Sequence, residues 1–224
     1  MPRTAKTAAA SPPSTNGATS FTPVSNDAAS DVILSEPYQV RVTIRGIVPI
    51  LFHRWSVEAI AEKAAAPKGS EMKKTDNVES YVYRDEDGNI CLPGEYLRQS
   101  VAESARNIQD PRSSRASGKT LYKTCVVPLT ELAPILYEGK PIGQWDFLDT
   151  RRVMVQRQGI SRTRPGVAKD WQATVELQVL TPEYINFNQL HDRLVAAGRY
   201  VGVGDFRPTF GRFSVVNMER ITYD

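Results

Sequence analysis

The stretch Tyr38–Ile50 constrains the fold more than any other, because its apolar and polar residues alternate. Val40, Val42 and Ile44 fall on one side of this alternation, while arginine and threonine residues fall on the other. A period of two places successive side chains on opposite faces of a strand, so the pattern predicts a β-strand with one buried face. We therefore place the start of the folded region at Pro37.

The segment before this strand, residues 1–36, has a different composition. It is rich in Ala, Ser, Thr and Pro and contains almost no large apolar side chains. Such a segment cannot bury enough apolar surface to offset the entropy lost on ordering it, so we predict a disordered tail. A tether to a partner is the alternative role of this tail. The rest of the chain, residues 37–224, is expected to form one domain.

The periodicity then switches between strand and helix along the chain. Turn residues at Asp85–Asn89 predict a hairpin, Ser56 is a candidate N-cap, and Gly198 is expected to end the last helix. The predicted helices span residues 55–66, 95–108 and 188–197. The predicted strands span residues 38–50, 81–83, 90–92, 124–129, 153–156, 171–180 and 212–221, and residues 110–123 are expected to form a polar loop. This order predicts an α+β fold with a ferredoxin-like, or RRM-like, antiparallel sheet that carries insertions.

Composition excludes several classes of protein. The net charge of +3 is too small to indicate a nucleic-acid partner by itself, so the distribution of charge matters more. Cys91 and Cys125 lie in apolar surroundings and are expected to be buried thiols, which suits a reducing compartment. Only His53 and His191 could add imidazole ligands, so no metal site and no cofactor is expected. No stretch approaches the ~18 apolar residues of a membrane span, and a cytoplasmic protein is expected.

The strongest functional signal is the glycine-rich stretch near the end of the chain. Glycines let a backbone pass close to a phosphate or a base, and guanidinium groups bind phosphate in a bidentate manner. Phe206 and Phe210 could stack on bases. A structural turn between helix and strand is the alternative interpretation. The candidate nucleic-acid-binding residues in and beside this stretch are Arg199, Gly202, Gly204, Arg207, Gly211 and Arg212.

Two basic runs give a second signal, because neither contains an acidic residue. Loops of this kind can wrap a nucleic-acid backbone and release its counterions, whereas a solvated loop is the simpler interpretation of either run alone. The candidate binding residues are Arg112, Arg115, Lys119 and Lys123 in the first run and Arg151, Arg152, Arg157, Arg162 and Arg164 in the second.

The segment that follows the first strand carries His53, a weak candidate for a general base or a nucleic-acid contact. A histidine satisfied at a strand end is the simpler interpretation. Trp55 is expected in the core rather than as a stacking platform. The chain lacks the HExxH and GxSxG motifs, and no pair of carboxylates has a spacing that argues for acid–base chemistry. The residues therefore favour a binding protein over an enzyme.

Two motifs together resemble the RAMP superfamily, the ferredoxin-like backbone subunits of CRISPR effector complexes. Ile90–Arg98 resembles the Pro-Gly helix opening of that family, and Gly202–Phe213 is similar to its glycine-rich loop. Both occur in the family's order. The resemblance implies that residues 151–170 form a thumb-like insertion that presses against a guide RNA, and that Arg98 lines the binding groove. The aspartate that target-cleaving members carry after the first strand has no counterpart here, which implies binding rather than cleavage.

These signals combine into one hypothesis, a non-catalytic subunit that binds single-stranded nucleic acid, with RNA favoured over DNA. Copies of the chain would assemble along the strand, together with other subunits of a ribonucleoprotein complex of antiviral defence. Base pairing with a second strand would supply sequence recognition, because phosphate contacts carry no base information. The alternatives are a phage or mobile-element protein that binds single-stranded DNA, a metal-independent endoribonuclease that uses His53, and an assembly protein whose basic loops bind an acidic partner.

Overall fold

The alternation along β1 (Tyr38–Gly46) is present in the structure, because Val40, Val42 and Ile44 are fully buried. The computed structural model describes residues 35–70, 77–155 and 158–222. Nearly all of the predicted tail, residues 1–36, therefore lies outside the described residues.

β1 lies inside an antiparallel sheet with the strand order β12-β1-β11-β7-β8, and β5 also pairs with β11. Hydrogen-bonded registers place Val42 opposite Val175 of β11 and Met218 of β12. The other strands of this sheet are β5 (Val126–Pro128), β7 (Leu136–Tyr137), β8 (Lys140–Pro141), β11 (Gln172–Val179) and β12 (Phe213–Ile221). The combination of helices with an antiparallel sheet confirms the α+β prediction.

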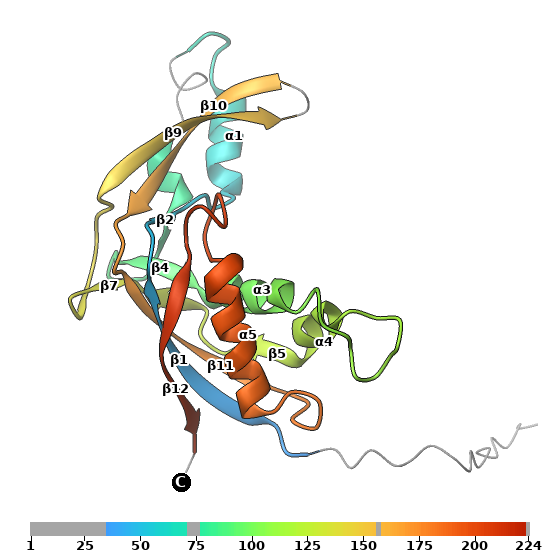
Figure 1. Ribbon diagram of the computed structural model, residues 1–224. Coiled ribbons are helices and arrows are strands. Elements are labelled where there is room, and N and C mark those ends of the chain that lie inside the picture. The colour runs from blue at the N-terminus through green and yellow to red at the C-terminus, as the bar shows by residue number, and fades with distance from the viewer. Residues whose placement is uncertain (1–34, 71–76, 156–157, 223–224) are drawn as a thin grey trace, which may run out of the picture. The chain divides into compact units, whose positions relative to one another are not determined.

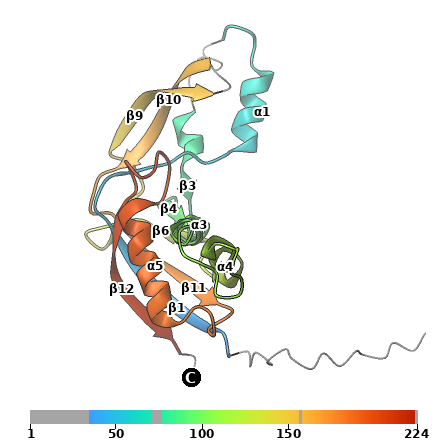
Figure 2. The ribbon, with the colours of Figure 1, turned by 45° about the vertical axis from the view of Figure 1, so that its right-hand side comes forward.

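Three helices cover one face of this sheet, as Figures 1 and 2 show. They are α3 (Gly94–Ser104), α4 (Gly118–Cys125) and α5 (Phe187–Tyr200). Leu97 of α3 and Leu194 of α5 are fully buried in the same core as the apolar residues of β1. The opposite face of the sheet carries polar side chains of β1 such as Arg41 and Thr43. The burial of one face only is what the alternating sequence requires.

Two insertions extend from this framework, one after β1 and one after β5. The second contains the β9–β10 hairpin, and β10 pairs with β2 of the first insertion as well as with β9. Figures 1 and 2 show the hairpin beside α1, beyond the end of the sheet. The elements of the insertions are β2 (Ile50–Leu51), α1 (Val57–Ala65), η1 (Val78–Tyr81), β3 (Tyr83–Arg84), β4 (Ile90–Pro93), β6 (Leu132–Pro134), β9 (Phe147–Val155) and β10 (Gln158–Val167).

Several local predictions are confirmed. Ser56 caps α1 by accepting a hydrogen bond of 3.2 Å from a backbone N–H in the first turn. Gly94 begins α3, directly after the last residue of β4. The β3–β4 hairpin turns at Gly88, whose φ is 80°. Cys91 and Cys125 are both buried free thiols.

Two helix predictions are corrected by packing. The segment 110–123 is not a continuous loop, because α4 begins within it and buries Leu121 and Cys125. Its buried residues Gly118, Leu121, Tyr122 and Cys125 do follow helical spacing, but the helix is only eight residues long and its other residues are polar or basic. The last helix does not end at Gly198 but continues to Tyr200. A Cβ atom at position 198 would lie 2.2 Å from the carbonyl oxygen of Phe213, so this glycine permits close packing against β12 rather than ending the helix.

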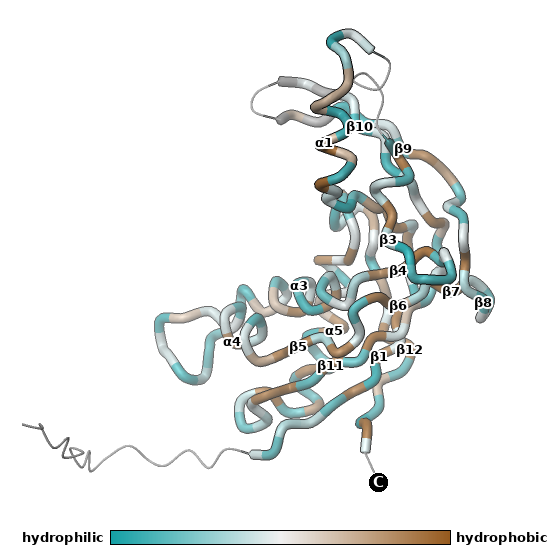
Figure 3. Tube along the Cα trace, turned by 180° about the vertical axis from the view of Figure 1, so that it is seen from behind, coloured by the Kyte–Doolittle hydropathy of each residue, from teal (hydrophilic) through white to brown (hydrophobic). Residues whose placement is uncertain are grey.

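In the insertions, the prediction for Trp55 is wrong, and the strand predicted at 153–156 is only part of a longer hairpin. Trp55 is 78% exposed rather than buried, because it precedes α1, a helix that buries none of its residues. Figure 3 shows hydrophobic residues in this surface helix. The described residues of this predicted strand, 153–155, belong to the longer β9, and its partner β10 was not predicted. Arginines at Arg162 and Arg164 interrupt the apolar pattern that would have identified β10.

Candidate nucleic-acid interface

A cleft of about 940 Å³ opens where the two sequence motifs meet. Its walls come from α3, from α4 and from the glycine-rich loop, the segment between α5 and β12. The lining residues are Glu95, Arg98, Gln99, Ala102, Glu103, Arg106, Asn107, Lys119, Lys123, Tyr200, Val201, Gly204, Asp205, Phe206, Arg207 and Pro208. The fold therefore brings together five predicted binding residues, which are Arg98, Lys119, Lys123, Gly204 and Arg207.

The glycine-rich loop closes tightly on itself. Gly202, Gly204 and Gly211 have φ values of 80°, 78° and 73°, a region that favours glycine. A Cβ atom at Gly211 would lie 1.7 Å from the carbonyl oxygen of Val203, so no other residue fits there. Backbone hydrogen bonds join this loop to the segment between β1 and β2. The glycines thus have a structural role within the protein, and the loop they shape carries Arg207 at the cleft.

Two carboxylates hold three of the cations in the cleft. Arg98 donates from Nε to Glu95 at 2.6 Å, and it also donates to a backbone carbonyl of α4, which joins the two helices. Glu103 forms ion pairs with Nε of Arg106, at 2.9 Å, and with Lys119. Hydrogen bonds from Arg98 lower the pKa of Glu95, and a hydrogen bond from Lys119 lowers the pKa of Glu103. Both carboxylates are therefore ionised at neutral pH.

The other two cations of the cleft, Lys123 and Arg207, have no ion pair within the part of the chain that the structure describes. Both residues are exposed. The cleft as a whole has five basic and three acidic side chains, which gives it a net charge of +2. Exposed cations without carboxylate partners are suited to phosphate contacts, because no existing ion pair has to be broken.

A second polar centre joins the glycine-rich loop to the hairpin. Asp205 forms an ion pair with Arg164 of β10, and its Oδ2 lies 3.5 Å from Nδ1 of His53. Burial alone would raise the pKa of Asp205, but hydrogen bonds from His53, Arg164 and the backbone N–H of Phe206 outweigh it and hold that pKa well below its usual range. Arg164 is only 6% exposed, so the carboxylate of Asp205 compensates a guanidinium that water scarcely solvates.

The two phenylalanines of the loop contact the same hairpin. The guanidinium carbon of Arg151 lies 4.9 Å from the ring centroid of Phe206 and 5.0 Å from that of Phe210, within cation–π range. Asp149 fixes Arg151 by hydrogen bonds of 2.9 and 2.8 Å. Phe206 also lines the cleft and is 38% exposed, with a left-handed backbone at φ 55°. The loop and the hairpin are therefore joined by both an ion pair and aromatic contacts.

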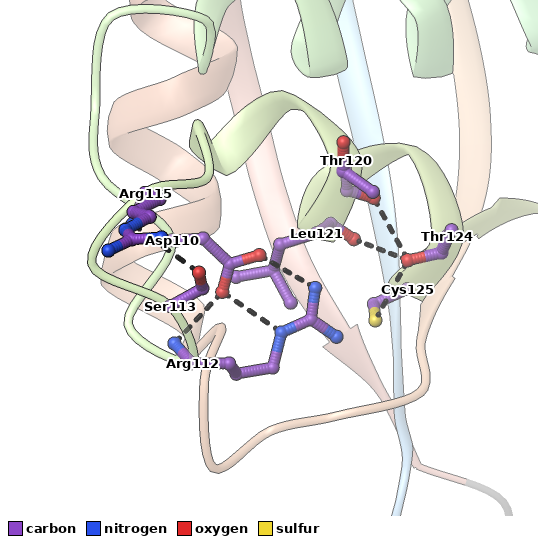
Figure 4. A network of polar contacts seen from close by, with 8 residues as sticks. All are labelled: Asp110, Arg112, Ser113, Arg115, Thr120, Leu121, Thr124 and Cys125. Carbon is purple, nitrogen blue, oxygen red and sulfur yellow. Dashed lines mark hydrogen bonds and ion pairs between the residues drawn. The ribbon is translucent and has the colours of Figure 1, made fainter.

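Other predicted binding residues lie outside the lining of this cleft. Arg112 is held by Asp110 through side-chain hydrogen bonds of 2.9 and 2.7 Å, and Arg115 lies in the same loop (Figure 4). Arg162 donates to the hydroxyl of Tyr81 at 3.3 Å. Arg152 lies exposed on β9, Arg199 lies exposed in the last turn of α5, Arg212 precedes β12 partly buried, and Arg157 lies outside the described residues.

Glu95, Gln99, Glu103 and Arg106 line the cleft but were not predicted as site residues. The first three follow one another at intervals of four residues on α3, which places them on one face of the helix. That spacing is the signal in the sequence that could have identified them.

His53 and Trp55 line a different cavity of about 660 Å³, bordered by α1, η1 and β10. The ring of His53 meets Tyr81 edge-on at a centroid distance of 4.5 Å. Among the described residues, no three His, Cys, Asp or Glu side chains are grouped so as to hold a metal ion. A search of the same residues finds no helix with the length and apolarity to span a membrane.

No family model and no curated protein sequence matches the chain. Among solved structures, a chain of the type III-B Cmr-beta complex bound to cognate target RNA aligns with a TM-score of 0.51 at 11% identity, covering 83% of this chain and 61% of that one. Cmr6 from Pyrococcus furiosus aligns with a TM-score of 0.43 at 12% identity, covering 81% of this chain and 100% of Cmr6, a likeness too loose to carry an argument. The first likeness is one of fold. It shows that this chain shares its fold with a chain of that type III-B complex, and it spans about three fifths of the length of the matched chain.

Proposed function

We propose that this chain is a non-catalytic subunit of a CRISPR-type effector complex that binds single-stranded RNA in the cleft between α3, α4 and the glycine-rich loop. The observation that carries the proposal is the convergence of the Pro-Gly helix and the glycine-rich loop on one positively charged cleft. The two motifs are separated by about a hundred residues, so only the fold could bring them together. The Cmr-beta structure, in which a chain of similar fold belongs to an RNA-bound complex, supports the same role.

The proposed framework is a ferredoxin-like domain. In chain order β1, α3, β5, β11, α5 and β12 alternate as strand, helix, two strands, helix and strand, and the paired order β12-β1-β11-β5 supports this assignment. The β9–β10 hairpin would act as the thumb-like insertion predicted at 151–170. Its contacts with Phe206 and Asp205 would hold it at a fixed angle to RNA lying in the cleft.

Lys123 and Arg207 are the residues that we assign to phosphate contacts. Copies of the chain would lie side by side along one strand, so binding should depend on the length of the RNA. The test is binding of labelled RNA and DNA of about 30 nucleotides across a salt series, with size analysis of the complexes. Contacts to several phosphates should make log K fall steeply with log salt.

The variants Lys123→Ala and Arg207→Ala should each weaken RNA binding about tenfold and reduce the salt slope by about 0.7, the contribution of one phosphate on a single strand. The matched control is Lys140→Ala, which removes an exposed lysine of β8 that does not line the cleft. An equal loss in the control, or an unchanged slope in both cleft variants, would contradict the assignment. Absence of binding to either strand at moderate salt would leave an assembly role with an acidic protein partner as the better account.

A metal-independent endoribonuclease is the second candidate function. It is favoured by the approach of His53 to Asp205, because a carboxylate at Nδ1 orients an imidazole that acts as a base. This function predicts that the purified protein cleaves RNA in the presence of a chelator and that His53→Ala abolishes the cleavage. Intact RNA after prolonged incubation with the wild-type protein would exclude it.

A further inference from the structure

The cleft contains a row of hydrogen-bond acceptors that its positive charge does not explain. Glu95, Gln99 and Glu103 occupy successive turns on one face of α3, and all three line the cleft. Four residues of an α-helix rise about 6 Å, so the row is regularly spaced along the cleft. We call these three residues the acceptor row.

Carboxylates are unfavourable neighbours for a bound polyanion, because like charges repel at short range. The side chains of Glu95 and Glu103 are nevertheless 41% and 34% exposed. Glu103 forms ion pairs with Arg106 and Lys119, while a carboxylate has about four acceptor sites, so it retains capacity for a further donor. Gln99 donates its amide N–H to Glu95 at 3.0 Å, which leaves its carbonyl oxygen as an acceptor.

RNA and DNA differ in the hydrogen-bonding groups of their backbones. Phosphate and ring oxygens of the backbone only accept hydrogen bonds, and the 2′-hydroxyl of ribose is the backbone group that can donate one. A row of acceptors flanked by cations is therefore complementary to an RNA backbone. It is not complementary to a DNA backbone, which meets the same negative charges without a donor to satisfy them.

We propose that the acceptor row makes the cleft select ribose over deoxyribose. The 2′-hydroxyls of the bound strand donate to the row while Lys123 and Arg207 hold the phosphates. This inference rests on the proposed function and assigns its substrate class to particular side chains. The selection has a repulsive part and an attractive part, because the carboxylates oppose any polyanion and only RNA offsets this opposition with hydrogen bonds.

The experiment compares three strands of about 30 nucleotides that contain only adenine and cytosine, so that the sugar is the sole difference between them. They are RNA, DNA and 2′-fluoro RNA, which keeps an RNA-like sugar pucker but cannot donate a hydrogen bond. Affinity is measured for the wild type, Glu103→Gln and Glu95→Gln. The control is Glu219→Gln, which also removes a carboxylate paired with an arginine but lies on β12, outside the cleft.

The wild type should bind RNA at least about tenfold more tightly than DNA or 2′-fluoro RNA, because a hydrogen bond to a charged acceptor is lost with each changed sugar. Glu103→Gln and Glu95→Gln should strengthen binding of DNA more than binding of RNA, so that the RNA-to-DNA affinity ratio falls about threefold or more. Glu219→Gln should leave the ratio unchanged.

Equal gains for RNA and DNA in both cleft variants would overturn the inference, because the carboxylates would then act only through their charge. Equal wild-type affinity for the three strands would overturn it as well, while the proposed binding function would stand. Failure to bind any strand would instead remove the proposed function, and the inference with it.

Discussion

Asp205 is the residue on which the site depends most, although it contributes no positive charge to the cleft. Its carboxylate is the ion-pair partner of Arg164, a guanidinium that is 6% exposed, and it also approaches His53. A buried charge deprived of its partner is costly, because water no longer solvates it. Asp205 therefore fixes the glycine-rich loop to the hairpin strand β10, and we assign it a positioning role.

Replacement of Asp205 by Asn should lower the free energy of unfolding at pH 7 by about 2 kcal/mol, less than for a fully buried pair because the carboxylate is partly exposed. A carboxyl whose pKa is lower in the folded state contributes stability that is complete above its unfolded pKa of about 3.9 and is lost as the pH falls through the folded pKa. Urea denaturation from about pH 5 to about pH 2 should show the wild type converging on the variant.

The control for this prediction is Asp192→Asn, which changes an aspartate whose side chain is 72% exposed on α5. It should alter the unfolding free energy little at pH 7, because an exposed carboxylate is well solvated. If Asp205→Asn and Asp192→Asn behaved alike, the ion pair with Arg164 would not be holding the loop.

At the scale of elements, α5 and β12 meet more closely than their sequences suggest. Gly198 lies inside α5, two residues before its last residue, and a Cβ atom there would overlap the carbonyl oxygen of Phe213. The glycine-rich loop begins directly after Tyr200, with its first glycine at Gly202, so the packing of this helix on β12 sets where the loop starts. Gly198, although it does not line the cleft, therefore helps to position the loop that does.

The variant Gly198→Ala separates helix propensity from packing, because the two effects predict changes of opposite sign in the free energy of unfolding. Propensity alone predicts a gain of about 1 kcal/mol from alanine in a helix. Overlap with a backbone atom predicts a loss of about 1–3 kcal/mol. We expect the loss, measured as the free energy of unfolding in urea. The neighbouring Ala196→Gly should cost about 1 kcal/mol from propensity alone, and a stabilised Gly198→Ala variant would refute the close packing.

At the scale of the whole described fold, the two faces of the sheet have different electrostatics. On the face opposite the helices, Arg41 pairs with Glu176 at 2.9 Å and with Glu219 at 3.2 Å, and Arg45 pairs with Asp170 at 3.0 Å. These cations already have carboxylate partners. The cleft on the helical side instead presents Lys123 and Arg207, without such partners among the described residues, so we expect RNA to bind on that side.

The double variant Arg41→Ala with Arg45→Ala should leave RNA affinity within about twofold of the wild type, because both arginines lie on the face of the sheet opposite the cleft. Their exposed ion pairs also contribute little to the stability of the fold. The double variant Lys123→Ala with Arg207→Ala removes the same amount of charge and should weaken binding about a hundredfold if the two contacts add. Both affinities are measured at one fixed salt concentration. Equal losses in the two double variants would indicate binding through net charge alone.

Local patterns predicted most elements, because periodicity and capping act within a few residues. The strand at β1, the cap at Ser56, the hairpin at Gly88 and the helix that starts after Pro93 were all identified from neighbouring residues. The predictions were wrong where the presence or absence of distant contacts decides the outcome. Trp55 is exposed because no other described element buries the helix that follows it.

The sequence by itself determined that this chain has an alternating strand, a Pro-Gly helix opening and a glycine-rich segment beside arginines, since each is a property of adjacent residues. Only the tertiary structure decided which of the many basic residues share one cleft, and that Arg164 is buried against Asp205 while Arg207 is exposed. The physical reason is that the environment of a charge depends on what packs around it. Partners from α3, α4, β10 and the glycine-rich loop meet through folding and not through proximity in the chain.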